Sequence, residues 1–181
     1  MALPALAGSC GPNGLPRYAW GVAVELKPPT PIPSSGRCMF FAGSIEMGTA
    51  EDWQSKLREE FEETRDLILL NPRRDAWDAS WEQSIDNAMF REQVTWELDG
   101  LDRADVIALY FAPGSKSPIS LLELGLHARQ GKLVVLCPEG FWRRGNVEVV
   151  CERFGLELHR DWDSWVEALR RRVAACSGVL E

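Results

Sequence analysis

Residues 105–136 read DVIALYFAPGSKSPISLLELGLHARQGKLVVL, and this stretch decides the fold class. Apolar runs at 105–111 and 133–137 have the length and the aliphatic content of buried strands. The segment between them, Ser117–Gln130, is predicted to be a helix. Two strands joined by a helix pair in parallel, so the stretch predicts a strand–helix–strand unit.

The helix in this unit carries the clearest boundary signals of the chain. Ser117 suits the N-cap position and Pro118 suits the first helical position, where a missing N–H has no cost. Gly131 suits a left-handed residue just beyond the helix end.

The same alternation continues on both sides of the unit. Further strands are expected at Cys38–Ala42, Leu67–Leu70 and Leu156–His159, and further helices at Ala50–Thr64, Ser84–Arg103, Val147–Phe154 and Trp162–Ala175. Alternating strands and helices predict an α/β fold, flavodoxin-like or Rossmann-like, with helices on both faces. Five parallel strands in the order 2-1-3-4-5 are the simplest arrangement. Ligands in such sheets bind beyond the carboxyl ends of strands 1 and 3, which indicates the loops 43–49 and 112–120.

The N-terminal segment has a different composition. Residues 1–36 hold seven of the eleven prolines. We interpret them as a Pro-rich extended or disordered tail, in which a short strand near Gly21–Leu26 is possible, and residues 37–181 as the domain.

Composition narrows the class of partner and compartment. The net charge is −7 and the isoelectric point is about 5.0. This charge argues against nucleic acid and anionic membranes as partners, but it permits a small nucleoside or nucleotide. No stretch is long and apolar enough to span a bilayer, and the N-terminus lacks the basic start of a secretory signal. Five scattered cysteines, without CxxC pairs, indicate a reduced, cytoplasmic protein without a zinc site.

Glu123 is the first candidate for chemistry. It follows the third strand within the helix and has leucines around it, so it is expected near the sheet and the ligand crevice. The alternative is a glutamate that faces solvent, since charged residues are rarely buried. A carboxylate beside a crevice is the nucleophile that glycosyl transfer through a covalent intermediate requires.

Other candidates lie in the loops at the same end of the sheet. Gly43 permits close approach of the backbone to a ligand, and Ser44 follows it. Ser117 either caps its helix or binds a sugar hydroxyl or a phosphate. Trp77 either stacks on a base or covers the core. Glu46 would repel a phosphate, which favours an uncharged nucleoside.

Several of these residues together resemble the nucleoside 2-deoxyribosyltransferase family and the related deoxynucleoside monophosphate N-glycosidases. The similar segments are FFAGSIEMGTAEDW (40–53), WELDGLDRADVIALYF (96–111), SPISLLELGLHARQGKLVVL (117–136) and RRGNV (143–147). The resemblance implies a flavodoxin-like fold, no cofactor, and a homo-oligomer with shared active sites.

The resemblance also implies roles for individual residues. Glu123 matches the nucleophile, and Glu97 stands where the family has an aspartate that contacts the sugar and assists proton transfer. Asn146 matches an asparagine that enters a neighbouring subunit's site in the transferases. Gly43 and Ser44 match the loop after the first strand. Ser117 matches a serine of the monophosphate hydrolases, where the transferases have an aspartate. Glu46 stands where those hydrolases have an arginine.

We therefore expect an enzyme that cleaves or transfers the N-glycosidic bond of a (deoxy)nucleoside through a glycosyl-Glu123 intermediate. Two alternatives remain open: hydrolysis of a nucleoside or nucleotide without transfer, and a non-catalytic nucleotide-binding module.

Overall fold

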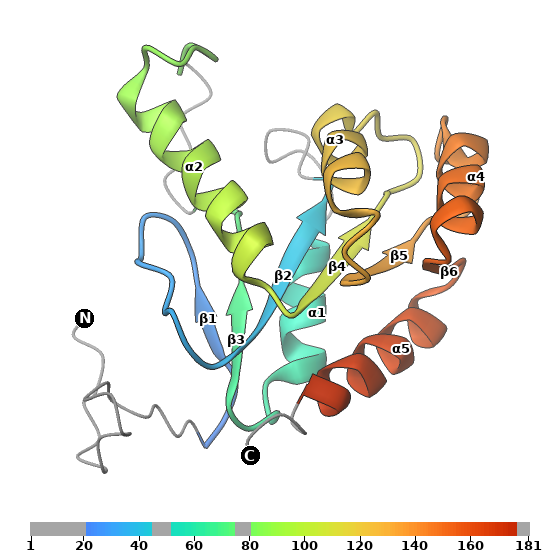
Figure 1. Ribbon diagram of the computed structural model, residues 1–181, viewed down its shortest axis with the longest axis horizontal. Coiled ribbons are helices and arrows are strands. Elements are labelled where there is room, and N and C mark those ends of the chain that lie inside the picture. The colour runs from blue at the N-terminus through green and yellow to red at the C-terminus, as the bar shows by residue number, and fades with distance from the viewer. Residues whose placement is uncertain (1–20, 45–51, 75–80, 177–181) are drawn as a thin grey trace.

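Figure 1 shows a single sheet with helices on both faces. The computed structural model describes residues 21–44, 52–74 and 81–176. The strands are β1 (Val24–Leu26), β2 (Arg37–Gly43), β3 (Leu67–Leu70), β4 (Val106–Tyr110), β5 (Leu133–Leu136) and β6 (Glu157–His159). All neighbouring strands pair in parallel, in the order β1-β3-β2-β4-β5-β6.

The predicted α/β flavodoxin-like class is confirmed, but the sheet has six strands, not five. Strands β2 to β6 keep the predicted order, and β1 is added at the edge beside β3. In that pairing, Leu26 lies opposite Leu70, and the N–H of Asn71 donates to the carbonyl of Leu26 at 2.9 Å. A strand of three residues is too short to show a recognisable apolar pattern within a proline-rich segment. It forms because the edge of β3 offers backbone groups with which it can pair.

Residues 21–36 also pack against the second helix. The indole N–H of Trp96 donates to the carbonyl of Thr30 at 2.7 Å, and Arg103 Nε donates to the carbonyl of Pro33 at 3.1 Å. Ile32 packs against the buried core. In the described part of the chain, residues that precede residue 37 therefore also pack against the domain. Residues 1–20 of the predicted tail lie outside the described residues.

Helices cover both faces of the sheet (Figure 1). They are α1 (Trp53–Phe61), α2 (Ala88–Arg103), α3 (Pro118–His127), α4 (Arg144–Phe154) and α5 (Trp162–Ala175). One core cluster joins the sheet to α2, α3 and α4, and the other joins it to α1 and α5. Successive side chains of a strand point to opposite faces of the sheet, so β2 contributes to both clusters. Phe40 lies in the first cluster and Phe41 in the second.

Capping side chains decide where two helices begin. The carboxylate of Asp52 accepts from the N–H of Ser55 at 3.2 Å, and α1 begins at Trp53. The side chain of Asn87 accepts from the N–H groups of Met89 and Phe90, so α2 begins four residues later than predicted. No helix among the described residues is long and apolar enough to cross a membrane.

Candidate functional site

The site lies where β2 and β4 end side by side at the carboxyl edge of the sheet. The chain leaves β2 toward β3 on one side and reaches β4 on the other, so these two ends form the expected switch point. Gly43 has a φ of 148°, and a Cβ atom there would lie 2.4 Å from the carbonyl oxygen of Tyr110. Only glycine fits this close approach, which carries the chain into Ser44.

Three buried serines meet at this switch point. The hydroxyl of Ser44 lies 2.9 Å from that of Ser115, which lies 2.8 Å from that of Ser117, and Ser44 also bonds Ser117 directly. The N–H of Ala112 donates to Ser44 Oγ at 3.1 Å, and Ser115 Oγ donates to the carbonyl of Ala112 at 2.8 Å. The cluster therefore joins the loop after β2 to the loop after β4. Ser115 had not been singled out from the sequence.

Ser117 occupies the predicted N-cap position of α3, with Pro118 as the first helical residue. Its side chain makes no capping bond, because its hydroxyl bonds Ser44 and Ser115 instead. Its φ of 43° places it in the left-handed region, which costs free energy for a residue with a side chain. Gly131 adopts the predicted left-handed conformation, although α3 itself ends at His127.

Glu123 lies on the sheet-facing side of α3. Its side chain is 8% exposed, which rules out the alternative of a solvent-facing glutamate. Burial, and then the charge of Glu97, raise its pKa from 4.5 to about 8. The opposite face of the same helix exposes the side chains of Ile119, Leu122 and Leu126.

Glu97 extends from α2 and interacts electrostatically with Glu123. Its carboxylate accepts a hydrogen bond from Gln93 Nε2 at 2.8 Å. Burial raises the pKa of Glu97, and the bond from Gln93 opposes that rise. The two carboxyl groups predicted as catalytic thus come from two helices, and the charge of Glu97 favours the protonated form of Glu123.

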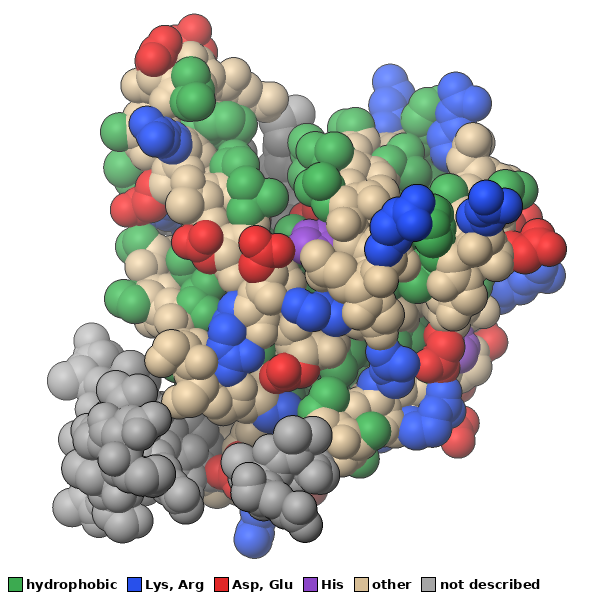
Figure 2. Space-filling view, in the orientation of Figure 1, with side chains coloured by type: hydrophobic (Ala, Val, Ile, Leu, Met, Phe, Trp, Pro, Cys, Tyr) green, Lys and Arg blue, Asp and Glu red, His purple; other side chains and the backbone are tan. Residues whose placement is uncertain are grey.

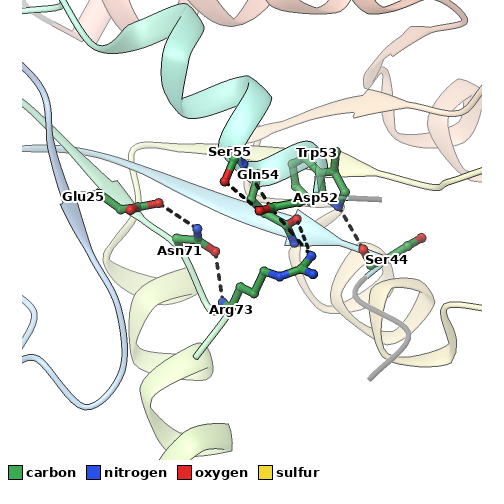
Figure 3. Close-up of polar contacts among 8 residues, drawn as sticks. All are labelled: Glu25, Ser44, Asp52, Trp53, Gln54, Ser55, Asn71 and Arg73. Carbon is green, nitrogen blue, oxygen red and sulfur yellow. Dashed lines mark hydrogen bonds and ion pairs between the residues drawn. The ribbon is translucent and has the colours of Figure 1, made fainter. Parts of the chain in front are cut away.

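A second polar cluster follows β3 and was missed in the sequence (Figure 3). The side-chain N–H of buried Asn71 donates to Glu25 Oε1 at 2.7 Å, and Asn71 Oδ1 accepts from the N–H of Arg73 at 3.0 Å. Arg73 Nη1 donates to Gln54 Oε1 at 3.4 Å and lies 3.7 Å from Asp52 Oδ1. The sequence signal was a run of polar residues directly after a strand.

The remaining candidates are not joined to this centre. Asn146 lies exposed in the first turn of α4, and its side chain makes no hydrogen bond to another described residue. Trp77 lies outside the described residues, as does Glu46.

No group of three or more metal-binding side chains occurs among the described residues. A shallow hollow of about 430 Å³ between Pro29 and the outer side of α2 contains none of the candidate site residues.

Comparison with known proteins places residues 37–141 in a family. A family model described as nucleoside 2-deoxyribosyltransferase like matches residues 37–141. This range includes every candidate site residue except Asn146.

Among solved structures, a conserved protein from Enterococcus faecalis V583 has a similar fold, with a TM-score of 0.53 and 11% sequence identity. The similarity covers 76% of this chain and 99% of that protein, and at this identity it concerns the fold alone. No curated protein matches the sequence. Because the family model matches more than half of the chain, including both carboxyl groups and the serine loops, the protein belongs to the nucleoside 2-deoxyribosyltransferase-like family.

Proposed function

We propose that this protein cleaves the N-glycosidic bond of a (deoxy)nucleoside or nucleotide through a covalent glycosyl-Glu123 intermediate. The observation that carries the proposal is the electrostatic interaction between buried Glu123 and half-buried Glu97, on the two helices that flank the switch point. Membership of the nucleoside 2-deoxyribosyltransferase-like family supports glycosyl chemistry at this site.

The reaction has two steps. The carboxylate of Glu123 attacks C1′ of the sugar, and a C1′–O bond forms while the C1′–N bond breaks. The electron pair of the broken bond stays on the base, which takes up a proton supplied from Glu97. In the second step, water or a second base attacks C1′, a new bond to C1′ forms while the C1′–O bond to Glu123 breaks, and Glu123 is released as a carboxylate. Glu97, now a carboxylate itself, takes up the proton that the water or base loses. Water makes the protein an N-glycosidase, and a base makes it a transferase.

The raised pKa of Glu123 has a direct consequence for the first step. Because the pKa of Glu123 is about 8, Glu123 of the free protein is mainly protonated near neutral pH. The reactive form has the proton on Glu97 and leaves Glu123 ionised. Moving one proton within the pair thus prepares the nucleophile and the acid together.

The serine cluster of Ser44, Ser115 and Ser117 supplies hydroxyl groups for the ligand. Ser117 stands at the start of α3, and hydroxyl and N–H groups at a helix N-terminus suit a sugar hydroxyl or a phosphate. The sequence favours an uncharged nucleoside, because Glu46 belongs to the loop after β2 and would repel a phosphate. The test therefore includes nucleosides and nucleotides.

The test is chromatographic. The purified protein is incubated with deoxynucleosides, ribonucleosides and their monophosphates, with and without a free acceptor base. Release of free base supports glycosidic cleavage, and new nucleosides that appear only with the acceptor support transfer. The nearly isosteric variant Glu123→Gln should lose turnover while its circular dichroism spectrum stays unchanged. Wild-type turnover in that variant would contradict the proposal.

If every substrate survives incubation, the alternative of a non-catalytic binding module takes first place. Bound nucleoside recovered unchanged after long incubation would support it. Asp163→Asn, an exposed carboxylate in the first turn of α5, serves as the matched control for Glu123→Gln.

The proposal includes a homo-oligomer with shared sites. Ile119, Leu122 and Leu126 form an exposed apolar stripe on α3, the helix that carries Glu123, and Figure 2 shows hydrophobic side chains on the surface over this helix. A second copy that covers this stripe would pack against the helix that carries Glu123. Asn146 is then the residue that such a copy would contribute.

We place the reaction in the cytoplasm. The described cysteines Cys38, Cys137, Cys151 and Cys176 are free thiols. Burial raises the pKa of Cys38, Cys137 and Cys151 to about 11, so their reactive thiolate forms are scarce at neutral pH. Unpaired thiols are typical of a reducing compartment.

A further inference from the structure

Gln93 joins the carboxyl pair to the central sheet. It lies one helical turn before Glu97 on α2, is 2% exposed, and shares the inward face of that helix. Its Nε2 donates to the carbonyl of Pro72 at 2.9 Å and to Glu97 Oε1 at 2.8 Å. Pro72 follows Asn71, whose N–H bonds β1, so the amide is anchored where β3 leaves the sheet.

The orientation of this amide is determined by its partners. A carbonyl oxygen and a carboxylate both accept, so the NH₂ end of Gln93 must face them, and both of its donor hydrogens are used. Rotation of the amide would break both bonds. Its Oε1 is buried and has no hydrogen-bond partner among the described residues. A buried acceptor without a partner costs free energy, and packing alone gives no reason to place one here.

We propose that Gln93 is a positioning residue, which fixes the carboxyl group of Glu97 relative to the sheet and thereby toward Glu123. The catalytic part of this inference rests on the proposed function. A carboxylate on a flexible side chain rotates about its terminal bonds, and the bond from Gln93 restricts that rotation. Proton transfer depends on such alignment, because a displacement of about 1 Å at a reacting group costs roughly a hundredfold in rate.

The first test needs no activity. Carboxyl groups of Glu97 and Glu123 are titrated by NMR in the ¹³C-labelled full chain and assigned with Glu97→Gln and Glu123→Gln. In Gln93→Met, which keeps the side-chain length but removes the donor, the pKa of Glu97 should rise because its ionised form loses a hydrogen bond. The pKa of Glu123 should stay near 8, because burial, the largest cause of its rise, is unchanged in this variant.

The second test is kinetic. Gln93→Met should lower kcat about 10- to 100-fold with little change in KM, the range expected for loss of a hydrogen bond to a charged group. Thr95→Val, on the exposed side of the same helix, is the matched control and should change neither kcat nor the titration. If Gln93→Met does not fold, Gln93→Glu keeps the size and polarity of the side chain and should raise the pKa of Glu97 through its added negative charge.

The outcomes separate the two proposals. An unchanged titration of Glu97 in the folded variant overturns the role of Gln93. An unchanged kcat in an active variant does the same. If the wild-type protein shows no glycosidic cleavage but the titration of Glu97 shifts, the proposed function fails while the positioning contact stands.

Discussion

Glu97 and Glu123 lie on different helices, yet the charge of Glu97 contributes to raising the pKa of Glu123 to about 8. Neither helix alone brings two acids together, and the contact exists because α2 and α3 pack on the same face of the sheet. Two carboxyl groups with different proton affinities are the arrangement that acid and nucleophile roles require.

The pH dependence of turnover follows from this pair. Glu123 must be ionised to attack, and its pKa of about 8 means that it is mostly protonated at neutral pH. The base must also receive a proton from Glu97, so the active form of the protein carries one proton on the pair. Above pH 8, where Glu123 of the free protein loses its proton, kcat/KM should therefore fall about tenfold per pH unit. Glu97→Gln removes the acid, so in this variant the fall above pH 8 should disappear and the remaining activity should rise with pH as Glu123 ionises. A pH–rate profile without an ionisation near 8 would contradict this assignment.

Stability should depend on pH through the same residue. The pKa of Glu123 is raised from its ordinary value of 4.5, expected for the unfolded chain, to about 8 in the folded protein. Its protonated form therefore stabilises the fold fully below pH 4.5, and this contribution is lost as the pH rises through 8. Glu123→Gln should abolish that loss, worth on the order of 5 kcal/mol above pH 8.

Urea unfolding at several pH values measures this effect. The unfolding free energy of Glu123→Gln should exceed that of the wild-type protein by a margin that widens from acid to alkaline pH. A margin that is constant with pH would show that Glu123 does not titrate as a buried group.

Gly43 should be intolerant of any side chain. In Gly43→Ala the new Cβ would lie 2.4 Å from the carbonyl oxygen of Tyr110, at a φ of 148°. We expect destabilisation of roughly 1–3 kcal/mol or more, measured by urea unfolding. Gly125→Ala on α3 is the control, because a Cβ there meets nothing within 4 Å and alanine favours a helix. Equal effects of the two substitutions on stability would contradict a steric clash at Gly43.

Self-association should depend on the apolar stripe of α3. Leu122, which is 57% exposed, lies at the centre of this stripe. Leu122→Glu should convert an oligomer into monomers, as measured by light scattering after size exclusion, because a charge would be buried in the contact. Val149→Glu on α4 makes the same kind of change at a side chain that is 65% exposed and should leave the assembly unchanged. A wild-type monomer, or an oligomer that survives Leu122→Glu, would refute this contact.

Local signals in the sequence were sufficient to predict the elements that form most of the sheet. Pro118 begins α3 as expected, and Gly131 takes the left-handed conformation, because both residues restrict or permit particular backbone angles by themselves. The apolar runs of β3, β4 and β5 predicted strands, because a strand buried on both faces has almost no polar residues. The resemblance of the loop and helix segments also pointed to Glu97 and Glu123.

What the sequence determined by itself was the succession of strands and helices and the class of the fold, and it supplied Glu97 and Glu123 as the candidate acids, since these depend on local backbone preference, periodicity and motif. Tertiary structure alone decided that β1 completes the sheet, that Ser117 bonds two other serines instead of capping α3, and that Gln93 holds Glu97. Hydrogen bonds and charge interactions act over a few ångströms between elements distant in the chain. Their partners are therefore set by packing, which no single segment of sequence contains.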